Sequence, residues 1–196
     1  MSLLDTIQQQ LGPDAVQQLS RRIGADPGTT GNAVDAALPL LVAALSRQAS
    51  DPARAAQLAN AVEQDHDGSL LDNMSGFLGG SGAPAGGNGI LGHILGQRRG
   101  AVEQGIGQTT GLDTSKVAQL LPMLAPIVMA ALGRAKRQRQ LDAGGVATLL
   151  TGERERLNER APGMMGALGR FLDQDGDGQV MDDVGGILGS VFGGKR

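Results

Sequence analysis

The chain has 196 residues, a net charge of −3 and no cysteine, tryptophan or tyrosine. This length suits one domain or two small ones, and 40% hydrophobic residues are enough to build a core, which excludes wholesale disorder. The absence of cysteine excludes disulfides, thiolate nucleophiles and thiolate metal sites, and the charge gives no overall attraction to nucleic acid or anionic membranes.

The first part of the chain carries start and stop signals of helices. Pro13 and Asp14 begin a stretch in which apolar residues recur every three or four positions, and Gly24 ends it. Asp51 followed by Pro52 predicts another helix, with aspartate as the N-cap and proline in the first turn. Few segments have the β-branched alternation of strands. The sequence therefore predicts an all-α, multihelical fold.

Several prolines lie inside apolar helical runs. Asp113 is predicted to cap a long apolar helix that contains Pro122 and Pro126, and Pro39 lies inside an earlier run. An interior proline costs about 3 kcal/mol unless the helix restarts or bends there. Each run is therefore predicted to form two helices or one bent helix. The run at 120–132 has no polar face, which indicates a buried central helix.

Neither the amino terminus nor the apolar runs predict a membrane protein. The stretch MSLLDTIQQQLG lacks a basic region and is interrupted by Asp5, unlike a secretory signal. The apolar run at 120–132 is too short to cross a bilayer and holds two prolines. We expect a soluble, cytoplasmic protein that does not bind membranes.

The second half of the chain repeats the first. At a spacing of 87 residues the alignment has no gap over about 50 positions. The alignment pairs positions where a helical structure most restricts the residue type: Gly24 with Gly111, Asp26 with Asp113, Pro39 with Pro126 and Arg47 with Arg134.

A second spacing, of 110 residues, aligns residues 63–79 with residues 173–189, and both segments are acidic around an Asp-Gly pair. The change in spacing implies an insertion near residues 152–172. We therefore predict two related helical modules, each ending in an acidic Asp-Gly loop, the second of which spans 173–183. The modules are residues 1–79 and 88–196, joined by a Gly-rich linker at 80–87.

The second half contains five motifs in order: GILGHILG at 89–96, TGLD at 110–113, LLPMLAPIVMAALGRAKRQ at 120–138, LDAGGVATLL at 141–150 and DGDGQVMDDVGGILG at 175–189. Together they resemble the YidB-like bacterial family of unknown function, domain-of-unknown-function family 937. The resemblance covers nearly the whole chain and implies a compact, multihelical, cytoplasmic bacterial protein. It implies no established activity and supplies no catalytic residue.

The stretch FLDQDGDGQVMDD contains most of a calcium-binding loop. Asp173, Asp175, Asp177 and Gly178 match the first, third, fifth and sixth positions of an EF-hand loop, and Gln179 offers its backbone carbonyl at the seventh. Carboxylates that converge in one turn repel each other unless a cation lies between them. The pattern therefore points to a Ca²⁺ site.

The last ligand of this loop is missing. Val184 stands where a bidentate carboxylate belongs, and Asp182 and Asp183 complete the candidate ligand set only if the loop is shorter. Two alternatives stay open: a weak Ca²⁺ site, or an acidic turn whose carboxylates cap the next helix. The aligned first segment has Glu63 and His66 at corresponding positions and makes a poorer calcium site.

Glycines recur every fourth residue in two stretches that share the motif GILG. On a helix this spacing places glycines on one face, where a second helix packs closely. Intramolecular packing, self-association and a partner helix are the alternatives. The candidate interaction residues are Gly92, Gly96, Gly185, Gly189 and Gly193, and the first series continues to Gly100.

No enzyme class is indicated. His66 and His93, the two histidines, have no nucleophile motif around them, and the chain has no Gly-rich phosphate loop. The sequence instead indicates a non-catalytic structural or protein-interaction protein, acting through a protein partner or self-association.

Two alternative functions stay open. One is a calcium-responsive regulatory protein that uses the loop at 173–183. The other is a helical DNA-binding protein that uses the basic cluster of Arg134, Lys136, Arg137 and Arg139. The acidic net charge and the lack of interleaved aromatic residues argue against nucleic acid, and cations at a helix C-terminus suit a solvated cap.

Overall fold

The computed structural model describes residues 2–80 and 86–160, and every element in these two stretches is helical. The all-α, multihelical prediction is therefore confirmed for them. In chain order the elements are α1 (Leu3–Gln10), α2 (Pro13–Ile23), α3 (Pro27–Ala49), α4 (Pro52–Asp65), α5 (Ser69–Asp72), α6 (Met74–Gly79), α7 (Gly87–Leu95), the 3-10 helix η1 (Gly96–Arg98), α8 (Arg99–Thr110), α9 (Thr114–Arg139) and α10 (Ala143–Arg160).

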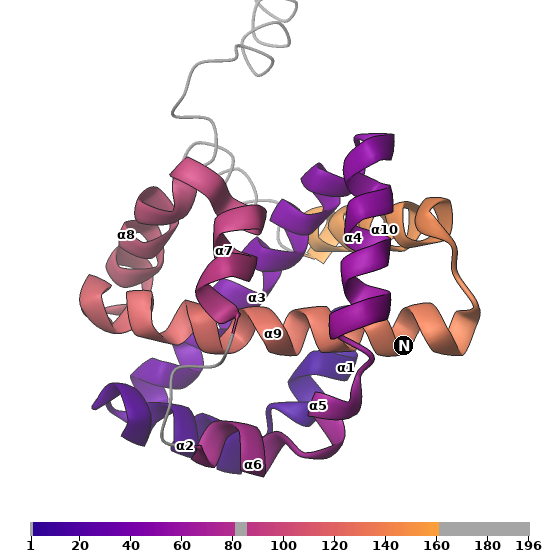
Figure 1. Cartoon of the computed structure of the whole chain (residues 1–196). Helices are drawn as coiled ribbons and strands as arrows, with labels where there is room; N and C mark the ends of the chain where they lie inside the picture. Colours follow the sequence, from indigo (N-terminus) through magenta and orange to yellow (C-terminus); the bar gives the residue numbers. More distant parts are fainter. Residues whose placement is uncertain (1, 81–85, 161–196) are drawn as a thin grey trace, which may run out of the picture.

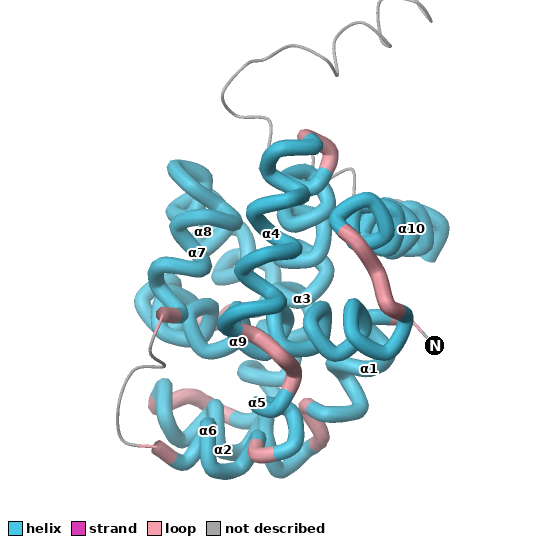
Figure 2. The backbone as a smooth tube through the Cα atoms, turned by 45° about the vertical axis from the view of Figure 1, so that its right-hand side comes forward, coloured by secondary structure: helices cyan, strands magenta, loops and turns pink. Residues whose placement is uncertain are grey.

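Helix α9 runs through the middle of the molecule (Figure 1) and packs against α1 to α5, α7, α8 and α10. Its residues from 120 to 133 are all buried, which confirms the prediction of a buried central helix. Helix α3 crosses α9 and supplies the other long apolar surface, and α2 and α6 lie together at one end (Figure 2). One hydrophobic core joins residues from Leu3 to Leu157.

The two apolar runs each form a single helix, so the alternative of two helices per run is wrong. Pro39 lies inside α3, and Pro122 and Pro126 lie inside α9. Proline lacks the N–H that would bond the carbonyl four residues earlier, so a continuous helix leaves that carbonyl in need of another partner.

Two of these carbonyls in α9 face other parts of the protein. The Ala118 carbonyl, freed by Pro122, accepts a hydrogen bond from Nη2 of Arg99 at 3.4 Å. The Pro122 carbonyl, freed by Pro126, lies against the start of α7, where a Cβ on Gly87 would stand only 2.1 Å from the oxygen. Tertiary contacts at these positions offset the cost of keeping the helix continuous.

The helix boundaries largely follow the predicted signals. The Asp51 carboxylate accepts hydrogen bonds of 2.9 and 3.0 Å from two backbone N–H groups in the first turn of α4. Gly24 ends α2 in the left-handed conformation, with φ of 64°. Asp113 stands at the N-cap of α9, but its side chain makes no capping hydrogen bond and lies 3.9 Å from the Lys116 ammonium instead.

Helices α3 and α9 are long and apolar enough to cross a membrane, because the run at 120–132 continues into a helix of 26 residues. Their apolar windows are, however, 67% and 83% buried inside the protein. A core position therefore accounts for their composition. The cytoplasmic localisation stays a prediction.

The connection that follows α4 lies directly on α9 at Gly133. A Cβ on Gly133 would stand 1.8 Å from the His66 carbonyl oxygen and 3.3 Å from Cγ1 of Val62. Gly68, two residues further along this connection, has φ of +88° and lies against the backbone of Arg134. Both glycines are needed for the close contact, because a side chain at either position would push the two backbones apart.

We expect Gly133→Ala to destabilise the protein by about 1–3 kcal/mol, because the added methyl overlaps a backbone carbonyl that cannot move alone. In a chain of this size each kcal/mol lowers the Tm by about 2–4 °C. Thermal unfolding followed by circular dichroism measures the change. Gly152→Ala is the matched control, since nothing lies within 4 Å of its Cβ, and it should raise the Tm slightly through helix propensity. Equal Tm values for the two variants would contradict the close contact.

Candidate functional site

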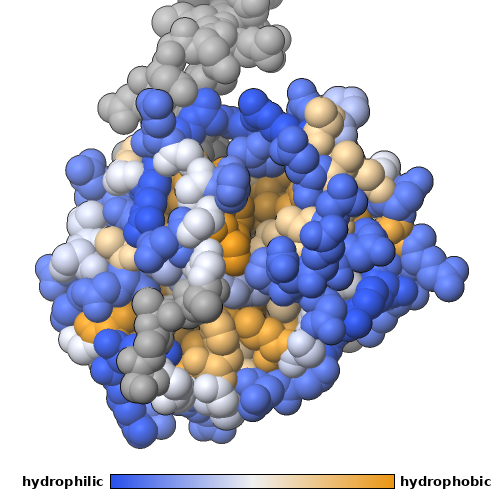
Figure 3. Space-filling view, in the orientation of Figure 1, coloured by the Kyte–Doolittle hydropathy of each residue, from blue (hydrophilic) through white to orange (hydrophobic). Residues whose placement is uncertain are grey.

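A groove of about 480 Å³ lies between α4 and α7, with α3 and α9 beneath it. In the space-filling view of Figure 3 this region is a hollow with apolar residues in its depth and polar residues around it. Twelve residues line the groove: Leu45, Gln48, Arg54, Gln57, Leu58, Ala61, Asp65, His66, Ile90, His93, Ile94 and Met129.

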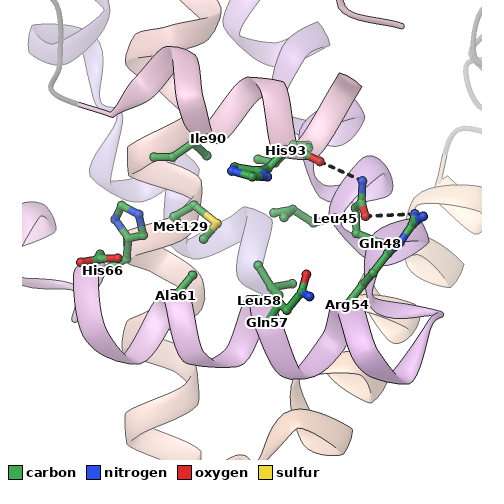
Figure 4. A pocket seen from close by; sticks show the side chains of 12 residues that line it. Leu45, Gln48, Arg54, Gln57, Leu58, Ala61, His66, Ile90, His93 and Met129 are labelled. Atoms are coloured by element: carbon green, nitrogen blue, oxygen red, sulfur yellow. Dashed lines mark hydrogen bonds between the residues drawn. The ribbon is translucent and has the colours of Figure 1, made fainter. Parts of the chain in front are cut away.

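Helical spacing brings the two walls of the groove together. The α4 wall uses residues three or four apart, from Arg54 through Leu58 and Ala61 to the end of the helix, so they share one face. On α7, Ile90 and Ile94 are four apart and occupy the facing wall (Figure 4). Leu58, Ala61 and Ile90 are half-buried, so their apolar surfaces are available to a bound group.

Two polar side chains close one end of the groove. Nε2 of Gln48 donates a hydrogen bond of 2.8 Å to the His93 carbonyl, and Nη1 of Arg54 donates to Oε1 of Gln48 at 3.3 Å (Figure 4). This chain links α4, α3 and α7 across the groove. The Arg54 side chain is exposed and provides a positive charge at this end.

The other end of the groove is formed by Asp65 and His66, where α4 stops. Burial lowers the pKa of the His66 imidazole, and the negative charge of Asp65 opposes this effect. His66 is therefore a neutral, half-buried imidazole at pH 7, with His93 on the opposite wall (Figure 4). No pattern in the sequence indicated that the two histidines line one groove.

The side chains that line the groove are apolar in its depth and polar at its ends. Its lining has no serine, threonine or cysteine that either histidine could activate as a nucleophile. Among the residues that the structure describes, no three histidine, aspartate or glutamate side chains come together as a metal site. The depth of the groove is formed by Leu45 and Met129, and a methionine side chain adapts to different apolar shapes.

The first acidic segment, residues 63–72, lies beside the basic C-terminal part of α9. Three ion pairs join them: Arg134 with Asp72, Lys136 with Glu63 at 2.7 Å, and Arg137 with Asp67 at 3.5 Å. Arg134 also donates a hydrogen bond of 3.1 Å to the Gly68 carbonyl. Three residues of the basic cluster, Arg134, Lys136 and Arg137, therefore pair with carboxylates of the same chain, and the nucleic-acid alternative stays a prediction.

The same ion pairs place a cationic side chain beside three carboxylates of the first acidic segment, those of Glu63, Asp67 and Asp72. The hydrogen bond from Lys136 lowers the pKa of Glu63, and the charge of the ammonium adds to this effect. The pKa of Asp67 is lowered first by its hydrogen bonds with Ser69 and then by the charge of Arg137. These contacts therefore favour the ionised forms of both carboxyl groups.

The predicted calcium ligands Asp173, Asp175, Asp177, Gln179, Asp182 and Asp183 lie outside the described residues, as do the interaction candidates Gly185, Gly189 and Gly193. Gly92 lies in α7, but α7 ends at Leu95 and Gly96 has φ of 55°. The expectation of one continuous glycine face through Gly96 to Gly100 is therefore wrong, because the left-handed turn at Gly96 redirects the chain. No atom lies within 4 Å of a Cβ added at Gly92, Gly96 or Gly100.

Comparison with known proteins places the chain in a family. The family model for a bacterial protein of unknown function, DUF937, matches residues 5–135. The chain belongs to the DUF937 family. This agrees with the resemblance to YidB-like proteins seen in the sequence. No curated protein and no solved structure matches the chain.

The matched part of this DUF937 protein contains the whole groove, the first acidic segment and Arg134, the partner of Asp72. Lys136 and Arg137, the partners of Glu63 and Asp67, follow directly after the matched part. The family description attaches no activity to the groove or to the acidic segment, so the geometry alone must indicate what they do.

We expect the stability of this DUF937 protein to fall as the pH drops below about 6.5, the ordinary pKa of histidine. The folded pKa of His66 is lowered, so the unfolded chain binds the proton first, and the loss continues until the pH reaches the folded pKa. Tm values between pH 8 and 5 measure this slope. His66→Gln should make the slope shallower and Asp65→Asn should make it steeper. An unchanged slope in His66→Gln would show that protonation of His66 does not cause the loss of stability.

Lys136→Met should raise the pKa of Glu63 toward its ordinary value of 4.5, because the ammonium at 2.7 Å is lost. The carboxyl carbon shift of Glu63, followed by NMR between pH 2.5 and 6.5, reports this change directly. Arg154→Met on α10 is a control that removes a cation without touching the segment. The ion pair would be disproved if Glu63 titrated identically in the parent and in Lys136→Met.

Proposed function

We propose that this protein is a non-catalytic interaction protein that binds an apolar helical segment of a partner protein in the groove between α4 and α7. The observation that carries this proposal is the combination of an apolar depth with a polar rim in a groove whose lining has no nucleophile beside its histidines. Helix-binding grooves have this character, since the partner contributes apolar side chains at every third or fourth position.

The dimensions and the chemistry of the groove support this proposal. A volume of about 480 Å³ lies in the usual range of binding pockets, roughly 300–1,000 Å³. Leu58 and Ile90 on the two walls offer apolar contact, and Met129 beneath them adapts to the shape of the inserted side chain. Arg54 at one end and Asp65 at the other would orient a partner helix through charges of opposite sign.

We also propose that the two halves arose by internal duplication. Helices α7, α8 and α9 follow α1, α2 and α3 in the same order, and α9 begins 87 residues after α3. Gly24 and Gly111 both end a helix in the left-handed conformation, and Pro39 and Pro126 both lie inside the long helix that follows. These correspondences support the duplication that the sequence spacing predicts.

The test of groove binding places a photo-reactive benzoylphenylalanine at Ala61 in the full-length protein, in its native cell. Cross-linking should join one defined protein to this position through an apolar, helical peptide, identified by mass spectrometry. The same amino acid at Ala56, which is exposed on the same helix but does not line the groove, is the matched control. Equal labelling from the two positions would show that the groove is not the contact.

Once the partner is identified, Ala61→Arg should weaken binding at least tenfold, because the larger side chain fills the part of the groove that the partner's apolar side chains would occupy. Ala56→Arg should bind as the parent does, and calorimetry with purified proteins measures both. The Tm of both variants should stay within a few degrees of the parent, since neither alanine belongs to the fully buried core. If the partner bound Ala61→Arg as tightly as the parent, the groove would not be its binding site.

A further inference from the structure

The face of α4 that lines the groove carries a regular stripe of four side chains. Arg54, Leu58, Ala61 and Asp65 follow one another at steps of four, three and four residues, and all four line the groove. Eleven residues are close to three full turns, so Arg54 and Asp65 extend from the same face of the helix. Their Cα atoms lie about 16 Å apart along the helix axis, at a rise of roughly 1.5 Å per residue. The stripe therefore presents a positive charge, two apolar contacts and a negative charge.

Asp65 differs from the acidic residues around it. Glu63, Asp67 and Asp72 each pair with a basic side chain of α9. Asp65 is exposed and lines the groove instead, and in the described part of the chain it belongs to no ion pair. The basic residues nearby are thus already paired with other carboxylates, which leaves the charge of Asp65 available to a bound group.

Arg54 provides the opposite charge and is held in place by a neutral group. Its Nη1 donates to Oε1 of Gln48, whose amide nitrogen is in turn bonded to the His93 carbonyl. An arginine has five N–H donors, so one hydrogen bond leaves most of the guanidinium free. No carboxylate among the described residues forms an ion pair with Arg54. The guanidinium is therefore positioned without having its charge compensated.

The two walls of the groove run in opposite directions (Figure 4). Ile90 lies on the side of His66, and the His93 carbonyl lies on the side of Gln48 and Arg54, so α7 runs antiparallel to α4. The backbone dipoles of antiparallel helices oppose each other, and together they give a helix in the groove no preferred direction. The direction is therefore left to the charged side chains at the two ends.

We propose that the partner helix carries an acidic and a basic residue eleven positions apart, and that it binds with the acidic residue at Arg54 and the basic residue at Asp65. Between the two charges it presents two apolar residues, four and seven positions after the first charge, which match Leu58 and Ala61. This inference rests on the proposed function, because it specifies which helices the groove accepts.

The charge pattern also sets the direction of the partner. An acidic residue is most favourable in the first turn of a helix and a basic residue in the last, because the backbone dipole is positive at the N-terminus. A partner with its acidic residue first is therefore the more stable helix. It lies parallel to α4, since Arg54 is in the first turn of α4 and Asp65 is its last residue.

Two synthetic peptides test the charge pattern with the full-length protein. The first is an alanine-based helix with glutamate, leucine four and seven positions later, and lysine eleven positions later. The second has glutamine in place of both charged residues, so neither peptide has a net charge. Fluorescence anisotropy at low salt measures the binding of both. We expect the charged peptide to bind about three- to tenfold more tightly, because each exposed ion pair contributes modestly.

Three variants locate the preference. Arg54→Gln with Asp65→Asn should bind both peptides equally. Arg21→Gln with Glu155→Gln is the matched control and should keep the preference, since it also removes one charge of each sign, at exposed positions outside the groove. Ala61→Arg should weaken the binding of both peptides, because the larger side chain fills the groove.

The outcomes separate this inference from the proposed function. If neither peptide bound the parent protein, the groove would not accept an apolar helix, and the proposed function would fall as well. If both peptides bound equally well, the groove would accept helices whatever their charges, and only the charge pattern would be overturned. A preference that survived in Arg54→Gln with Asp65→Asn would assign the recognition to other charges and would also overturn it.

The direction is tested with a bromoacetyl group on the N-terminus of the charged peptide. The protein has no cysteine, so Ala53→Cys, next to Arg54, and Gln64→Cys, next to Asp65, each introduce a single thiol at an exposed position. We expect the bound peptide to alkylate Ala53→Cys about fivefold faster, relative to the rates with free bromoacetamide, because its N-terminus is held at that end. Adding Arg54→Glu with Asp65→Lys should make Gln64→Cys the faster site. Equal relative rates, or a preference that the charge reversal leaves unchanged, would overturn the orientation.

Discussion

Helix α9 is apolar around most of its circumference, so it needs protein on every side. Residues 120–133 are all buried, and helices from both halves of the chain supply the covering surface. This requirement places α1, α2 and α5 against α9, although they belong to the first half of the sequence. It also explains how two interior prolines are tolerated, because α7 and Arg99 contact the carbonyls that the prolines leave free.

The position of α4 follows from the same requirement and produces the groove. The end of α4 is fixed on α9 at Gly133 and by the Lys136–Glu63 ion pair, while its first turn is linked through Arg54 to α3. Asp65 and His66 belong both to this anchored end and to the groove lining. A ligand in the groove would therefore touch residues whose backbone is held by the first acidic segment.

Local signals in the sequence predicted the helices but not their contacts. Asp51 and Gly24 mark helix ends by chemistry that acts within a few residues, and the structure agrees. The helices do not break at Pro39, Pro122 or Pro126, and at Pro122 the distant Arg99 donates a hydrogen bond to the Ala118 carbonyl that the proline leaves free. The groove joins His66 and His93 from two helices, and no local pattern predicts such a pairing. The acidic segment was visible in the sequence, but its partners on α9 were not.

The central place of α9 has a consequence for synthesis on the ribosome. The first eighty residues contain six helices, and two of them, α1 and α5, pack chiefly against α9, which spans Thr114–Arg139. Helices α1 and α5 must therefore wait until α9 has left the exit tunnel before they reach their final places. During this interval the apolar faces of the first half are open to chaperones, and a pause before α9 would lengthen that exposure.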